Sequence, residues 1–253
     1  MKTYFDNPEI IAGITLKEHG RPINNSVSLH TGHDASAVLE NREHLAQSIG
    51  LPLTHFVSAN QTHSDHFYHV TTEDFGRGAL TMEDAIQDTD ALYTYEPNIV
   101  LTSYTADCVP VLFYHETNGL IGAIHSGWQG TVKEITKKLF THLKNNENCN
   151  LNQLHVQLGM ALSQEKFEVD EDVYTKFKQL GYADEMMYFN EQTKKYHIDN
   201  QLVVKKQCEL AGVPTENITV DRTCTFLNKA GFSYREDRKC GRHVSYIVRK
   251  NRS

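Results

Sequence analysis

Three short polar segments carry the residue types needed for metal or nucleophilic chemistry. They read Asn-Gln-Thr-His-Ser at 60–64, Ala-Asp-Cys-Val-Pro at 106–110 and His-Ser-Gly-Trp-Gln-Gly at 125–130. Each places a polar side chain beside an apolar, strand-like run, where a scaffold commonly presents functional groups. If Cys108 and His125 share a face, they could bind Zn²⁺ or act as a nucleophile and its base.

A predicted β-hairpin tests whether these two residues meet. Asn-Gly at 118–119 separates the apolar runs 109–115 and 120–125, which is a strong hairpin pattern. A two-residue loop pairs residue numbers that sum to 237, and a four-residue loop pairs those that sum to 235. Both sums are odd, so His125 faces an even-numbered residue. If the strand stays regular past Pro110 to residue 108, Cys108 and His125 share one face of the hairpin.

Two interpretations of this pair remain open from the residues alone. His63 is a candidate third ligand, although sequence spacing does not by itself bring it to Cys108. In the alternative, Cys108 is a small buried hydrophobe and His125 is a hydrogen-bonded residue at a strand end.

The turn after His125 could bind an anion. Ser126 and Gly127 precede a helix expected from about Thr131, and backbone N–H groups at a helix N-terminus attract negative charge. The alternative is an ordinary strand-to-helix turn with Trp128 in the core.

Arg42 interrupts the apolar side of a helix predicted for residues 36–49. Val38, Arg42, Leu45 and Ile49 follow the spacing of one helical stripe. An unpaired buried charge is costly, so the guanidinium either clamps an anion in a pocket or reaches solvent or a structural carboxylate.

The elements that must position these residues are of mixed type. Helices and hairpins do not alternate strictly, which favours an α+β fold over a doubly wound sheet. Residues 71–90 are expected to form a long loop. The other expected strands are 10–16, 55–59, 154–160, 217–226, 231–236 and 243–249, and the other expected helices are 131–144, 170–180 and 199–211.

Composition excludes several classes of protein. The 253-residue chain has a formal charge of −7 and no basic stripe, which argues against nucleic acid and an anionic membrane surface as partners. The N-terminus has no apolar signal segment and no run is long enough to span a membrane, so a cytoplasmic protein is expected.

Five irregularly spaced cysteines without a CxxC pair argue against a disulfide framework. The chain also lacks GxGxxG, GxxxxGK[ST], HExxH and GxSxG.

Taken together, the motifs resemble those of the YfiH family, also called the laccase-domain or multicopper polyphenol oxidase family and, more recently, a purine nucleoside phosphorylase family. The resemblance rests on Gln61-Thr62-His63-Ser64, Ala106-Asp107-Cys108-Val109-Pro110 and His125-Ser126-Gly127-Trp128-Gln129-Gly130. It extends over nearly the whole chain through Asn41-Arg42, Phe167-Glu168-Val169, Phe232-Ser233-Tyr234-Arg235 and Gly241-Arg242.

The resemblance implies a single domain over residues 1–253, with a four-layer α/β/β/α arrangement of mixed and antiparallel sheets. It implies a zinc site at His63, Cys108 and His125. It also implies phosphorolysis of adenosine, inosine, guanosine and methylthioadenosine, together with adenosine deaminase activity. The expected partners are therefore a purine nucleoside and phosphate, in a monomer or small homo-oligomer.

Further residues are candidates for catalysis or binding. Asp107 is expected either to act in acid–base chemistry or, preferably, to orient His63 or His125. The candidates for substrate and phosphate binding are Arg42, Gln61, Ser126, Gly127, Arg235 and Arg242.

This chain departs from the family pattern at positions that bear on phosphate. Gln129 stands where the family usually has Arg, Glu236 where a second Arg is common, and Ser64 where Gly is usual. Three other functions therefore stay in view: a metal-linked amidase or cysteine hydrolase acting on cell-wall precursors, a copper-type polyphenol oxidase, and a non-catalytic nucleoside- or metal-binding regulator.

Overall fold

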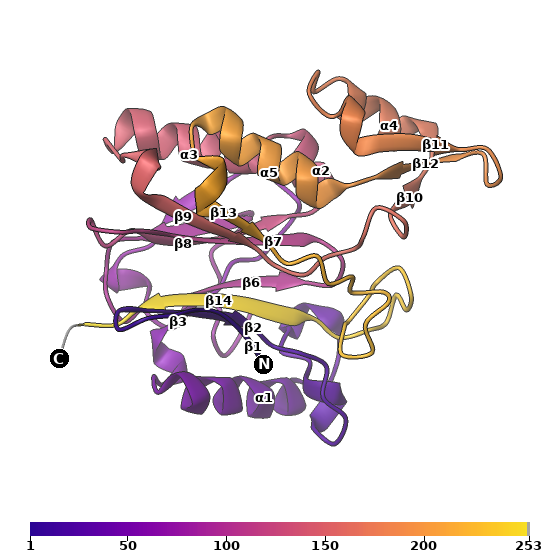
Figure 1. The fold of residues 1–253 in the computed structure, drawn as a ribbon. Helices are drawn as coiled ribbons and strands as arrows, with labels where there is room; N and C mark the ends of the chain where they lie inside the picture. Colours follow the sequence, from indigo (N-terminus) through magenta and orange to yellow (C-terminus); the bar gives the residue numbers. More distant parts are fainter. Residues whose placement is uncertain (252–253) are drawn as a thin grey trace.

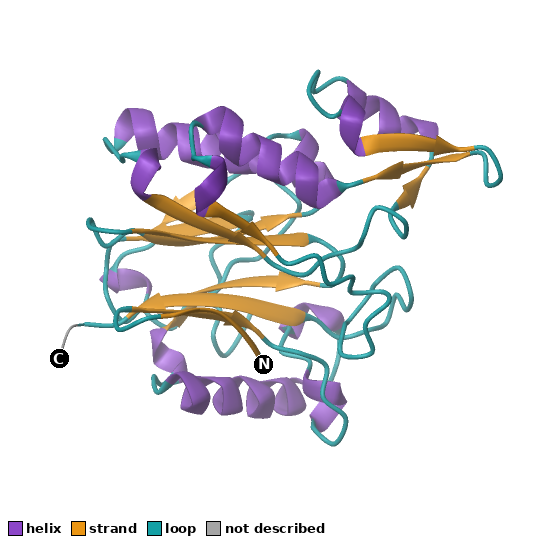
Figure 2. Ribbon diagram, in the orientation of Figure 1, coloured by secondary structure: helices purple, strands orange, loops and turns teal. Residues whose placement is uncertain are grey.

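Two β-sheets lie face to face between outer layers of helices in the computed structural model, which describes residues 1–251 (Figure 1). Figure 2 shows the four layers in the order helix, sheet, sheet, helix. This α/β/β/α arrangement confirms the predicted α+β class. The strands are β1 Lys2–Asp6, β2 Ile10–Ile14, β3 Phe56–Val57, β4 Phe67–His69, β5 Ala91–Thr94, β6 Val100–Thr105, β7 Val109–His115, β8 Ile121–Ser126, β9 Leu154–Leu158, β10 Glu168–Val169, β11 Met187–Asn190, β12 Lys195–Ile198, β13 Ile218–Val220 and β14 His243–Arg249. The α-helices are α1 Ala35–Ile49, α2 Trp128–Val132, α3 Ile135–Asn146, α4 Glu171–Lys178 and α5 Asn200–Ala211.

The first sheet has the strand order β1-β2-β14-β6-β3 and is covered on its outer face by α1. Residues alternate along β6: Val100 and Tyr104 pack toward α1, whereas Leu101 faces the space between the sheets. Helix α1 begins where the Asp34 side chain accepts a hydrogen bond from Ser36 N–H and ends at Gly50, which has a left-handed conformation. The helix predicted for 36–49 is confirmed.

The second sheet has the order β13-β9-β7-β8-β5-β4, and it contains the predicted hairpin as β7 and β8. The register pairs Pro110 with His125 and Leu112 with Ala123, so the sum of 235 is the correct one. Val111 and Phe113 pack beneath the outer helices, while Leu112 faces the first sheet. Because side chains alternate, the even-numbered face of β7 is the one that looks into the space between the sheets.

Helices α2, α3 and α5 cover the outer face of the second sheet (Figure 1). The single helix predicted for 131–144 is in fact two, because the chain breaks at Glu134, whose backbone is left-handed with φ 62°. Helix α2 therefore begins at Trp128, three residues earlier than expected. The break turns α3 so that Ile135, Leu139 and Leu143 pack on the sheet.

A small unit of α4 and the three-stranded sheet β10-β12-β11 extends beyond the layers at one end (Figure 1). Its own core gathers around the buried Phe177 and Ile198. The half-buried Trp128 packs against this core, so the unit is anchored beside the turn that follows His125.

The predicted strand at 231–236 is wrong. Phe232 N–H donates to His243 Nε2 at 2.7 Å instead of joining a sheet ladder, and residues 221–242 cross the end of the sandwich as a loop. This places Tyr234, Arg235 and Arg242 above the ends of β6 and β7. Among residues 1–251, no helix combines the length and the apolar character that crossing a membrane requires.

Candidate metal centre

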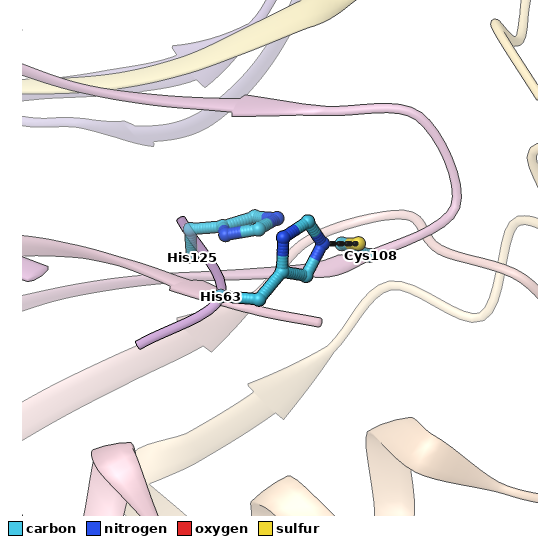
Figure 3. Close-up of side chains that lie close together, drawn as sticks. All are labelled: His63, Cys108 and His125. Atoms are coloured by element: carbon cyan, nitrogen blue, oxygen red, sulfur yellow. Dashed lines mark hydrogen bonds between the residues drawn. The ribbon is translucent and has the colours of Figure 1, made fainter. Parts of the chain in front are cut away.

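Three side chains converge where chain segments cross from the first sheet to the second (Figure 3). His63 lies in the connection from β3 to β4, Cys108 lies between β6 and β7, and His125 lies near the end of β8. The ligand atoms of all three lie within 4.8 Å of one another, and Cys108 Sγ is 3.8 Å from His63 Nε2. The structure thus brings together the three residues that the sequence offered only as candidates.

The spacing of these atoms fits a divalent metal. Zn–N and Zn–S bonds of roughly 2.1 and 2.3 Å at a tetrahedral angle separate a nitrogen from a sulfur by about 3.6 Å, close to the observed distance. The His63 and His125 rings meet edge to face with centroids 4.8 Å apart, so their nitrogens can approach one point from different directions. Three protein ligands leave a fourth position for a reactant, which is typical of catalytic zinc.

The charges in the cluster favour the metal-binding form of the sulfur. Burial opposes ionisation of Cys108, but the neighbouring His125 and His63 outweigh it and lower the pKa of the thiol. Burial also opposes the imidazolium of His125, yet the Cys108 sulfur and the Asp90 carboxylate raise the pKa of that ring. Since the thiolate is both the metal ligand and the nucleophilic form of cysteine, the geometry alone supports either chemistry.

The Asp90 carboxylate bonds to the His125 ring and to the backbone of His63. Its Oδ1 lies 2.7 Å from His125 Nδ1, and its carboxylate accepts the backbone N–H groups of Thr62, His63 and Ser64. Although burial opposes its ionisation, hydrogen bonds from His125 and Ser64 lower the pKa of Asp90 to about 2. The carboxylate fixes the His125 ring so that Nε2 faces the cluster, as partners of metal-binding histidines commonly do.

Gly127 lies so close to His63 and Cys108 that no larger residue fits at this position. A Cβ at this position would lie 2.6 Å from His63 Cδ2 and 3.0 Å from Cys108 Sγ. The glycine-rich turn therefore serves close approach of the backbone to the cluster. Helix α2 is only five residues long, and Ser126 directs its hydroxyl to Thr131 Oγ1 rather than to a cavity.

Two cavities meet at the cluster, and both are lined by His63, Ala106, Cys108 and Tyr234. The larger, of about 630 Å³, extends toward the small α4 unit and is lined by Trp128, Phe167 and Glu168. The smaller, of about 400 Å³, lies on the other side. It is lined by Ser28, His30, Gln61, Tyr104, His125 and Arg242.

Gln61 holds the His63 loop in place. Its Nε2 donates to Tyr104 O at 2.9 Å and its Oε1 accepts from Tyr104 N at 2.8 Å, so its amide adds to β6 as a peptide group would. Both ends of the amide are thereby engaged by the protein, although the residue lines the smaller cavity.

The expectation that Asp107 orients a histidine is wrong. Its Oδ1 accepts from Thr225 Oγ1 at 2.6 Å and its Oδ2 accepts from Arg235 N at 2.7 Å, while Asp90 holds His125. Asp107 lines the larger cavity, and its left-handed φ of 86° marks a sharp turn next to Cys108.

The three candidate arginines lie in different places relative to the two cavities. Arg42 is 3% exposed, donates to the backbone oxygens of Val27, Gly78 and Ala79, and lines neither cavity at the cluster. Arg235 lies on the larger cavity and donates through Nη1 to Glu168 O. Arg242 lies on the smaller cavity.

Sequence reasoning missed several residues of the site. Asp90 directly precedes the buried strand β5, and a carboxylate at that position was the one available signal. Ser28 and His30 come from a 3₁₀ turn at Leu29–Thr31 whose partners are distant in sequence, and no local pattern marked them.

Comparisons with known proteins show the family to which the chain belongs. Residues 18–250 match the family described as multi-copper polyphenol oxidoreductase laccase, and the chain belongs to that family. The purine nucleoside phosphorylase YlmD of Bacillus subtilis is 33% identical over 259 aligned residues, which cover 98% of this chain and 92% of that protein. The purine nucleoside phosphorylase SSP1584 of Staphylococcus saprophyticus is 34% identical, over 93% of this chain and 90% of its own.

Solved structures show the same fold. The hypothetical protein YfiH of Bacillus licheniformis superposes with a TM-score of 0.91 at 30% identity, covering 97% of this chain and 98% of its own. YlmD from Geobacillus stearothermophilus gives the same TM-score and identity and covers 97% and 94% of the two chains.

Proposed function

We propose that this protein is a zinc-dependent purine nucleoside phosphorylase that also deaminates adenosine. The observation that carries the proposal is the cluster of His63, Cys108 and His125, in which His63 and Cys108 line both cavities and His125 lines the smaller one. A reaction that joins two reactants, a nucleoside and phosphate, needs such an arrangement because proximity supplies much of the rate. The names of the curated relatives support the nucleoside as substrate.

The larger cavity suits a nucleoside. Trp128, Phe167 and Tyr234 offer ring faces to a purine. Glu168 and Asp172 offer carboxylate oxygens that can accept hydrogen bonds from ribose hydroxyls. A volume of about 630 Å³ lies within the range typical of small-molecule sites.

Two imidazoles and one thiolate suit zinc, which when bound would act as a Lewis acid beside the reactants. Cu²⁺ also binds nitrogen and sulfur ligands tightly, so added copper can displace zinc. Residues 1–251 hold one such cluster. We therefore place the activity at this single centre, acting on free nucleosides in the cytoplasm.

The test is an assay of the full chain purified without added metal. Adenosine with phosphate is expected to give adenine and ribose 1-phosphate, and adenosine without phosphate is expected to give inosine. Inosine, guanosine and methylthioadenosine serve as further substrates. Metal analysis of the same preparation should find about one zinc per chain and little copper.

Matched variants tie the activity to the site. Cys108→Ala and His63→Ala should abolish turnover, whereas His66→Ala, three residues along in the same loop and exposed, should not. Full activity of Cys108→Ala would refute the site. Absence of product from every nucleoside in the zinc-loaded protein would refute the function.

A further inference from the structure

The two cavities differ sharply in charge. The larger is lined by Asp107, Glu168, Asp170 and Asp172 against Lys195, Arg235 and Arg238, so acidic groups outnumber basic ones by four to three. The smaller is lined by Arg242 and, among the described residues, by no carboxylate. The formal charge of the lining side chains is therefore −1 in the larger cavity and +1 in the smaller, which favours the smaller one for a doubly charged anion.

A second cation lies behind the wall of the smaller cavity. The buried Arg42 guanidinium carbon lies 5.1 Å from the centroid of the Tyr104 ring. Tyr104 also lines the smaller cavity. Its hydrogen bonds go to neutral backbone oxygens, so no carboxylate cancels its charge. Burial lowers the pKa of His30, and the charges of Arg42, Arg242 and His125 lower it further, although the hydrogen bond to Asn60 raises it.

Arg242 is held with part of its guanidinium free. Nη1 donates to the backbone oxygens of Cys240 and Gly241, at 2.8 and 3.0 Å, and the guanidinium carbon lies 5.5 Å from the Tyr234 ring centroid. Within residues 1–251, Nε and Nη2 have no hydrogen-bond partner. A half-buried guanidinium fixed in this way can offer its remaining N–H groups to an oxyanion.

Ser28 and His30 complete the polar wall. Asn60 Nδ2 donates to Gln87 Oε1, so Asn60 Oδ1 accepts the proton on His30 Nε2. His30 Nδ1 is then left as an acceptor, 3.3 Å from Ser28 Oγ. Ser28 Oγ–H and His30 Nδ1 therefore bond to each other. If the hydroxyl turns to donate to an anion, Nδ1 is free to accept from an anion that still carries one proton.

We infer that the smaller cavity is the phosphate subsite, with Arg242 as its anchor and Ser28 and His30 as its polar wall. The inference rests on the proposed function and specifies how the two reactants divide between the cavities. A phosphate oxygen forms a bond to ribose C1′ while the bond from C1′ to the purine nitrogen breaks. The bonding pair leaves with the purine, which takes the proton of hydrogen phosphate, and ribose 1-phosphate is the second product.

The test compares variants of Arg242 in the zinc-loaded full chain. Arg242→Gln should raise KM for phosphate about 10- to 100-fold, because a charge-assisted hydrogen bond contributes roughly 1.5–3 kcal/mol. KM for the nucleoside should stay within about twofold. Arg242→Lys, which keeps the charge but loses the planar fork, should fall between. Lys239→Gln removes the same charge from an exposed position of the same loop and should leave both constants unchanged.

Titration of inorganic phosphate into the zinc-loaded protein separates this inference from the proposed function. A chain that makes no ribose 1-phosphate but binds phosphate, and loses that binding in Arg242→Gln, would refute the function and keep the subsite. If phosphate binding and KM are unchanged in Arg242→Gln and instead weaken in Arg235→Gln, phosphate occupies the larger cavity and the inference is wrong. Zinc content and thermal unfolding of each variant show whether the fold is intact, and Arg242→Lys carries the test if Arg242→Gln fails to fold.

Discussion

Asp90 and His125 are 35 residues apart in the chain, yet the Asp90 carboxylate lies 2.7 Å from His125 Nδ1 with both side chains buried. The same carboxylate accepts the N–H groups of residues 62–64 and so also sets the backbone from which His63 projects. One buried charge therefore aligns two of the three metal-binding side chains.

Asp90→Asn should weaken zinc binding about 10- to 100-fold, because an amide cannot replace the carboxylate beside both His125 and the loop N–H groups. Competition with a chromophoric chelator measures this affinity. Asp6→Asn is the control, since its side chain is exposed at the end of β1. Zinc binding by Asp90→Asn within twofold of the parent protein would contradict the assigned role.

Gly127→Ala should displace His63 or Cys108 and lower zinc occupancy, because the added Cβ would lie 2.6 Å from the His63 ring. Gly130→Ala is a matched control. The nearest atoms to a Cβ there are 3.4 Å away, and alanine favours the helix. Metal analysis of both purified variants checks the expectation, and equal zinc content in the two would count against close packing at Gly127.

Arg42→Met should destabilise the fold by about 2–4 kcal/mol, because it leaves the oxygens of Val27, Gly78 and Ala79 without their donor. Urea unfolding measures the change. Lys194→Met, which removes an exposed ion pair with Glu191, should cost less than about 1 kcal/mol. Equal losses in the two variants would show that the buried hydrogen bonds of Arg42 contribute little.

His243 should make the fold sensitive to acid. Burial lowers the pKa of His243 from 6.5 to about 4, and the neutral ring accepts from Phe232 N–H and donates to Thr15 O. Between pH 6.5 and 4 the unfolded chain binds a proton that the folded chain does not, so stability falls as the pH falls, by about 3 kcal/mol from this group. Above pH 6.5 the contribution is fully present.

His243→Gln tests this linkage. Glutamine can donate and accept but does not titrate, so the variant should lose about 3 kcal/mol less than the parent protein between pH 6.5 and 4. Urea unfolding at several pH values measures both slopes. Parallel slopes would mean that the pKa of His243 is the same in the folded and the unfolded chain.

Local patterns predicted the elements that local forces determine. The Asn-Gly turn and side-chain alternation predicted that His125 pairs with an even-numbered residue, and the helix expected at 36–49 is α1. Cys108 lies in the bend before β7, and its sulfur joins the cluster from there. The break at Glu134 was missed because no Gly or Pro marks it. The strand expected at 231–236 failed because Phe232 bonds to the His243 ring, a tertiary contact that alternation does not report.

The site was predictable only in part for the same reason. The residue types of His63, Cys108 and His125 were visible, but their meeting depends on the crossing between two sheets. Asp90 bonds to His125, 35 residues away, and His30 bonds to Asn60, 30 residues away, and no local pattern pairs such residues.

Cys108 lies on the segment that leaves the first sheet and enters the second, and the His63 segment makes the same crossing. A metal ion bound by both His63 and Cys108 would cross-link the two segments that connect the sheets at this end of the sandwich. Removing the metal with a chelator should therefore loosen this end of the sandwich first. The rate of amide hydrogen exchange should rise at residues 60–64 and 106–108 and stay unchanged at the opposite end, near Asn118–Gly119. Under the proposed function, removing the ion would therefore stop the reaction and also loosen the end of the sandwich that lines both cavities.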